Sequence, residues 1–318
     1  PSVERGHARI SIAPNGVDFE TGPANVSFLL YDDPIIERLT PAGGPSDGGT
    51  AVLVRGLHME SDAAHMNASR ALCRFGRGDP SKAVVSMSKG AVECAPSPPA
   101  ALAPSNDAEN RWLQLALNGQ QFAPLADVPS AAFRYYEQPS LLAIHPKAGP
   151  VGGGTIVTLT GDGLGRFGQL GYHAHGGVND GMPLCFFGGP CFDEAGIHRG
   201  PQCSLPVAVA LNLSAEPRAV AATALAPSRL LCRAPPLSGP LPQLTSVSRG
   251  RTSVRVALAL NGQNFAHELA PLFSYVSGVL VGAVEPLMGP PAGRVQIRIS
   301  GDNFDLYGGG GAGGGGGD

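Results

Sequence analysis

Apolar and polar residues alternate at three places in the chain, each time just before an Asn-Gly pair. The three segments are Ile10–Phe19, Leu113–Phe122 and Val256–Phe265. Alternation with a period of two predicts a β-strand, and Asn-Gly favours the positive φ angles of a tight type I′ turn. A second expected strand follows each pair and carries an aromatic anchor: Phe28, Phe133 and Phe273. The pattern predicts three copies of one hairpin in a tandem array of modules.

The front half of each module repeats as well. An apolar segment leads to a Gly-Pro pair and then to a strand that ends at a glycine. Apolar residues alternate ahead of these glycines: Val52 and Val54 before Gly56, Val157 and Leu159 before Gly161, Ile297 and Ile299 before Gly301. This alternation predicts one buried and one solvent-facing side for each strand. Three residues beyond each glycine comes an apolar plug: Met59, Leu164 and Phe304.

Composition agrees with an all-β chain. Few stretches repeat apolar residues at the helical period of about 3.6. Gly and Pro contribute 45 and 30 of the 318 residues, and 43% of the chain is hydrophobic. That is enough apolar material for packed cores, and the length allows two or three domains.

Charge argues against a nucleic-acid partner, and the length of the apolar runs argues against membrane insertion. The net charge is −3 and the pI about 6.3, with arginine and lysine scattered along the chain. Nucleic-acid binding relies on a basic stripe, so we expect no nucleic-acid partner. No run reaches the roughly 18 apolar residues of a membrane span, so we expect no direct membrane insertion of this segment.

A second pair of motifs lies between the two halves of a module. Cys73-Arg-Phe-Gly76 precedes Cys94-Ala-Pro96, and Cys185-Phe-Phe-Gly188 precedes Cys232-Arg-Ala-Pro235. Taken in order with the Gly-Pro, strand-end glycine, Asn-Gly and Phe-x-Tyr motifs, they make nearly the whole chain resemble the IPT/TIG domain. That family's modules occur in plexins and in several transcription factors. The resemblance implies tandem immunoglobulin-like β-sandwiches with seven strands and about 100 residues each.

The resemblance also implies the disulfides Cys73–Cys94 and Cys185–Cys232. Cys191 and Cys203 fall inside an insertion, where we expect them to close a local loop. An even number of cysteines fits an oxidising, extracellular or cell-surface compartment. Three sequons point the same way and predict glycosylation at Asn25, Asn67 and Asn212. The alternative, buried free thiols in a cytosolic protein, stays open at this point.

Module boundaries follow from the alignment. Residues 1–33 would supply the C-terminal hairpin of a truncated module, 34–138 and 139–277 two complete modules, and 278–318 the start of another. The second complete module carries two insertions, and the Gly-rich run 308–317 would be a loop in the last piece. We therefore expect a segment of a larger protein. Short linkers such as Glu137-Gln138-Pro139 would make the array semi-rigid.

Candidate chemistry is sparse. Gly163–Gly168 matches G-x-G-x-x-G after a strand, but the residues that follow cannot begin the helix a dinucleotide site needs. His173 and His175 lack a third fixed metal ligand, and Asp32-Asp33 and Asp302/Asp305 lack the ligand spacing of calcium sites. No nucleophile constellation occurs. We expect no catalysis, no cofactor and no metal.

The expected function is therefore structural: a non-catalytic, adhesive spacer and protein-interaction array of a large extracellular glycoprotein. Its partners would be other protein chains, through self-assembly into a surface fibre or flagellar appendage or through a surface partner. The alternative is a plexin-like receptor ectodomain that binds a protein ligand. A carbohydrate-binding accessory would need exposed aromatic platforms, and aromatics are only 6% of the chain. A transcription-factor module would need basic loops.

Overall fold

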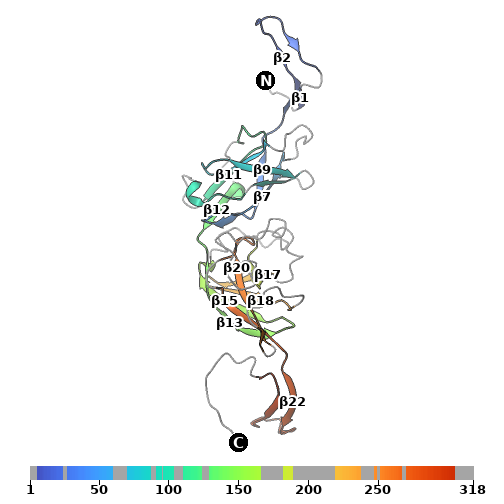
Figure 1. The fold of residues 1–318 in the computed structure, drawn as a ribbon, viewed down its shortest axis with the longest axis vertical. Coiled ribbons are helices and arrows are strands. Elements are labelled where there is room, and N and C mark those ends of the chain that lie inside the picture. Colours follow the sequence, from blue (N-terminus) through green and yellow to red (C-terminus); the bar gives the residue numbers. More distant parts are fainter. Residues whose placement is uncertain are drawn as a thin grey trace. The chain divides into compact units, whose positions relative to one another are not determined.

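The computed structural model confirms an all-β fold (Figure 1). Among the described residues no α-helix occurs, only the short 3-10 turns η3 (Ala100–Leu102) and η4 (Pro129–Ala131). Two compact units divide the chain, Pro1–Tyr136 and Glu137–Asp318. The structure describes residues 6–23, 27–59, 70–86, 91–94, 96–103, 110–123, 129–165, 182–188, 219–237, 247–248, 251–266 and 270–304.

The main sheet path of the first unit has the order β5-β7-β10-β9-β8-β11-β12-β6. Its strands are β5 (Ile35–Thr40), β6 (Gly43–Pro45), β7 (Val52–Leu57), β8 (Leu72–Phe75), β9 (Ser81–Ser86), β10 (Ala91–Cys94), β11 (Asn110–Ala116) and β12 (Ala132–Tyr136). All neighbours are antiparallel except β6 and β12, which run parallel.

One strand links the two layers of this sandwich. Residues 81–82 of β9 pair with β8, whereas residues 83–86 pair with β10. The path therefore folds over at β9, with β5-β7-β10 on one side and β8-β11-β12-β6 on the other. The apolar faces of both layers meet in one core, which includes Val52, Val54, Phe75 and Phe133.

The second unit repeats this topology with the order β13-β15-β18-β17-β16-β20-β21-β14. Its strands are β13 (Ser140–His145), β14 (Ala148–Pro150), β15 (Ile156–Asp162), β16 (Leu184–Phe187), β17 (Ala219–Ala226), β18 (Arg229–Arg233), β20 (Arg251–Ala259) and β21 (Leu272–Val276), with β19 (Val247–Ser248) paired to β20. Here β17 has the place of β9, because residues 219–221 pair with β16 and the rest with β18. The parallel pair is β14 with β21.

Three two-stranded sheets complete the described chain. The first unit adds β1 (Gly6–Arg9) with β4 (Ser27–Leu30), and β2 (Ser11–Ile12) with β3 (Glu20–Thr21). The second unit adds β22 (Leu280–Glu285) with β23 (Arg298–Asp302). Each X-Pro bond at the end of a module's first strand is cis: Thr40-Pro41, His145-Pro146 and Glu285-Pro286.

The aligned apolar residues are buried in two copies and exposed in the third. Val52, Val54, Val157 and Leu159 have no exposed side-chain surface, and the plugs Met59 and Leu164 are buried. The predicted buried face and plug of the last copy are wrong for the described residues, because Ile297, Ile299 and Phe304 are 58%, 48% and 43% exposed. The reason is that β22 and β23 form a sheet of two strands with no second layer over it among the described residues.

Strand-end glycines are required by close approach of the backbone. A Cβ atom at Gly56 would overlap the carbonyl oxygen of Ile35, and one at Gly161 that of Ser140. Both sites lie beside a β-bulge in the first strand of the module. The bulge brings the two chains too close for any larger residue. Gly301 repeats the arrangement against Leu280.

The Asn-Gly turns differ from the type I′ prediction. That turn needs positive φ at both central residues, and here only the glycines have it: Gly16, Gly119 and Gly262. Each glycine N–H donates to the alanine carbonyl three residues earlier. Each asparagine side chain accepts hydrogen bonds from the next two N–H groups after its glycine. The prediction is wrong because the asparagine side chain closes an Asx turn, which does not need positive φ at that residue.

Candidate functional site

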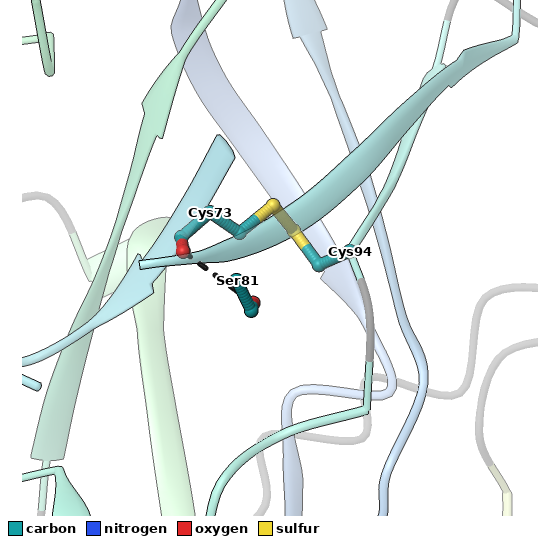
Figure 2. Close-up of a disulfide and its surroundings, with 3 residues drawn as sticks. All are labelled: Cys73, Ser81 and Cys94. Carbon is teal, nitrogen blue, oxygen red and sulfur yellow. Dashed lines mark hydrogen bonds between the residues drawn. A yellow bond between two sulfur atoms is a disulfide. The ribbon is translucent and has the colours of Figure 1, made fainter. Parts of the chain in front are cut away.

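The structure joins Cys73 of β8 to Cys94 of β10, with the two Cα atoms 5.8 Å apart. Figure 2 shows the bridge with Ser81 of β9 beside it; the Ser81 hydroxyl donates to the Cys73 carbonyl at 3.4 Å. The two cysteines flank the strand that passes from one layer to the other. The bridge therefore holds the two layers at the point where the sheet path changes direction.

The second unit carries the same staple. Cys185 of β16 is joined to Cys232 of β18 with a Cα separation of 6.3 Å, inside the usual range of about 4.4–6.8 Å. All four sulfur-bearing side chains are buried. These pairs are the ones that the family resemblance implies. Bonded, buried cysteines offer no thiolate for chemistry.

Several candidates fall outside the residues that the structure describes. They are Cys191, Cys203, Asn25, Asn67 and Asn212, together with His173, His175, Asp305 and the Gly-rich run 308–317. The disulfide Cys191–Cys203 and the three glycosylation sites stay predictions. Of the G-x-G-x-x-G motif, the described part is Gly163–Gly165, in which Leu164 is fully buried as a core plug.

A tyrosine holds the loop that follows each second cysteine. Tyr135 donates its hydroxyl to the Pro98 carbonyl at 2.7 Å, and Tyr275 donates to Pro235 at 2.9 Å. Each ring also packs edge-on against the module's central phenylalanine, with centroids 5.1 Å apart in both pairs. The sequence contains both partners, a Phe-x-Tyr motif and a proline four residues after Cys94 or three after Cys232, but only the fold shows that they meet.

Burial changes the ionisation of these phenols. Desolvation raises the pKa of Tyr135 to about 12, although Ser97 and Arg111 oppose the shift. Desolvation also raises the pKa of Tyr275. Both hydroxyls therefore stay protonated and act as hydrogen-bond donors at physiological pH. Their role in the fold is structural.

Asp32 and Asp302, two of the candidate calcium ligands, lie near groups that are not calcium ligands. The Asp32 Oδ2 atom lies 3.5 Å from the His58 Nε2 atom, and Asp302 lies in β23 opposite Leu280. Within the described ranges no group of three or more His, Cys, Asp or Glu side chains could hold a metal ion. Over the same ranges, no helix has the length and apolar character that crossing a membrane would need.

Comparisons with known proteins point to one family. A model of the IPT/TIG domain matches residues 139–190. Human plexin-B3 (Homo sapiens) is 32% identical over 179 residues, which are 52% of this chain and 8% of that protein. Plexin-A4 of Danio rerio is 30% identical over 139 residues, 41% of this chain and 6% of the relative. The chain thus spans less than a tenth of the length of these curated relatives.

Solved structures that resemble the chain include two of the plexin A4 extracellular region. The match to the first, which has domains 1 to 10, covers 90% of this chain and 20% of the plexin A4 chain. Its sequence identity is 18% and its TM-score 0.42. The match to the second, which has domains 1 to 8, covers 80% of this chain and 20% of the plexin A4 chain. Its sequence identity is 17% and its TM-score 0.35.

The family match and the plexin relatives confirm the resemblance to IPT/TIG domains of the extracellular type. Two buried disulfides agree with that setting, since such bonds persist in oxidising compartments. The chain is therefore extracellular or exposed at the cell surface.

Proposed function

We propose that this chain is a non-catalytic segment of a plexin-like receptor ectodomain, in which tandem IPT/TIG modules space and orient the parts that bind a protein ligand. The observation that carries the proposal is the plexin similarity, which reaches 52% of the chain. The stapled sandwiches support it, because their buried side chains form packed cores and structural bonds. The two relatives reported above are plexins, which favours a receptor ectodomain over the fibre or adhesive coat expected from sequence alone.

We also propose the module limits 34–138 and 139–277 inside this segment. Support comes from the pairing of strands, because those from Ile35 to Tyr136 bond among themselves, as do those from Ser140 to Val276. A polypeptide cut at these limits would keep every strand of its sheet. Residues 1–33 and 278–318 would then belong to flanking modules.

Surface labelling of intact source cells separates the receptor from the fibre. Membrane-impermeant biotin is applied, and the labelled protein is detected with an antibody raised against this chain. The receptor proposal predicts a labelled protein that stays with the membrane through high-salt washing and is released by detergent. Release by salt alone as a sedimenting polymer would overturn it in favour of the fibre.

A further inference from the structure

The loop after each strand-end glycine has the same backbone conformation in three copies. The residue two positions beyond the glycine is left-handed each time: His58 (φ 59°), Gly163 (φ 73°) and Asn303 (φ 69°). Non-glycine residues rarely adopt this conformation, and asparagine and histidine are among the few enriched there. Its recurrence shows that the loop geometry is part of the module.

The side chains of His58 and Asn303 contact equivalent backbone carbonyls in their two modules. His58 Nδ1 lies 3.1 Å from the Asp33 carbonyl oxygen, and Asn303 Nδ2 donates to the Gly278 carbonyl at 2.9 Å. Strand register makes these carbonyls equivalent, because Ile36 pairs with Gly56 and Val281 with Gly301. Each carbonyl therefore lies three residues before the paired strand residue, in the linker that leads into the module.

The middle copy has no side chain to make this bond. A Cβ atom on Gly163 would lie 3.5 Å from the Cα atom of Pro139, so the loop there packs directly on the linker proline. The three linkers are thus held in different ways, by an imidazole, by backbone packing and by a carboxamide.

The imidazole contact depends on charge. His58 Nδ1 faces the Asp33 carbonyl while Nε2 faces the Asp32 carboxylate at 3.5 Å. Both partners accept hydrogen bonds, and a neutral imidazole has one N–H whereas the imidazolium has two. Only the protonated ring can donate to both acceptors.

The linker before His58 is attached to the same module by a second side chain. Tyr31 is half-buried against the core that includes Leu39 and Leu117. Desolvation raises the pKa of its phenol, with the Asp33 charge as the next contribution, so the Tyr31 phenol stays neutral at physiological pH. Histidine is the side-chain type whose charge changes between weakly acidic and neutral pH, so a comparison of these two conditions tests the contact.

We infer that the left-handed loop residue is a linker clasp, by which a module holds the segment that enters it, and that the His58 clasp tightens on protonation. In its protonated form the ring binds both the Asp32 carboxylate and the Asp33 carbonyl. In its neutral form one of the two bonds is lost, and residues 31–33 become freer to move. The Asn303 clasp has no titrating group and is insensitive to the same change. The clasp would act in the same way in a receptor or in a fibre.

Nitrogen-15 relaxation of the complete 318-residue chain tests this inference. Rigid backbone has order parameters of about 0.85 and flexible backbone below about 0.6. We expect residues 31–33 to be near the rigid value at pH 5.5 and to fall toward the flexible value at pH 8. Residues 277–279, beside Asn303, should keep the same order parameters at both values of pH.

Three variants give the matched comparison. His58→Asn should keep the carbonyl bond and remove the pH dependence, and His58→Gly should leave residues 31–33 flexible at both values of pH. His145→Asn, which removes an exposed histidine elsewhere, should behave as the unmodified chain. Order parameters at 31–33 that do not change with pH in the unmodified chain, or that stay rigid in His58→Gly, would overturn the inference. Amide spectra of each variant verify that the module is folded.

Discussion

The Tyr135 phenol allows the contribution of one hydrogen bond to stability to be tested. Replacing Tyr135 by Phe keeps the ring contact with Phe133 and leaves the Pro98 carbonyl without its donor. A hydrogen bond of this kind contributes about 0.5–1.5 kcal/mol, so the free energy of unfolding should fall by that amount. Urea titration monitored by the protein's fluorescence measures the difference.

The same phenol predicts a dependence on alkaline pH. Its pKa is about 12 in the fold against 10.0 as the ordinary value. A raised folded pKa stabilises the fold fully below pH 10, and that contribution is lost as the pH rises from 10 to about 12. Tyr135→Phe should therefore lose less stability over this window than the unmodified chain. Equal slopes for both proteins would contradict the assignment.

Gly161 and Gly152 lie in the same module and allow a crowded glycine to be compared with one that has open space around it. Gly161→Ala places a methyl group against the Ser140 carbonyl, whereas around Gly152 nothing lies within 4 Å of a Cβ atom. We expect Gly161→Ala to lower the free energy of unfolding by about 1–3 kcal/mol, the range for overpacked sites. Gly152→Ala should change it by less than about 0.5 kcal/mol. Equal thermal shifts of the two variants would argue against the bulge geometry.

Among the elements, the disulfides should contribute according to the length of chain they enclose. Cys73–Cys94 spans 21 residues and Cys185–Cys232 spans 47. Loop-closure entropy gives about 3 kcal/mol for the first and about 4 kcal/mol for the second. Paired alanine variants, one for each bridge, should show this order when denaturant unfolding is monitored. The reverse order would indicate that enthalpy or residual unfolded structure outweighs loop length.

Strand positions could be predicted well because each depends on local alternation. Val157 and Leu159 are buried as expected, and Phe133 and Phe273 occupy strands after the Asn-Gly turns. The predicted turn type is wrong because Asn118 can satisfy its neighbours' N–H groups with its own side chain.

Apart from the two disulfides that the family resemblance implies, contacts between distant residues could not be predicted. The contact of His58 with Asp33 joins residues 25 apart, and the strand that follows Asp33 has a register shift between Ile36 and Arg38. Alternation fixes which side a residue faces but gives no information on such shifts. The tyrosines and the prolines that accept their hydrogen bonds are both visible in the sequence, but no spacing rule connects them.

For the whole molecule, the compartment can be tested on secreted protein. We expect peptide mass spectrometry without reduction to show Cys191 linked to Cys203, and glycans at Asn67 and Asn212. Both results follow from an oxidising secretory route with sequons accessible to the glycosylation machinery. Expression of the same chain in a reducing cytosol is the control. Free Cys191 and Cys203 with unmodified sequons in the secreted protein would contradict the predicted modifications.

The parallel pairs β6–β12 and β14–β21, one in each sandwich, have a mechanical consequence. Arg134 donates to the Ala42 carbonyl and Ser46 to that of Tyr136, and Ser274 and Val151 make the matching bonds with Lys147 and Val276 in the second module. Each pair joins the opening segment of a module to its closing strand. Tension drawn through the chain pulls these two strands in opposite directions along their length. The hydrogen bonds between the two strands are then loaded in shear and share the force. A module should therefore unfold only when all of these bonds break together.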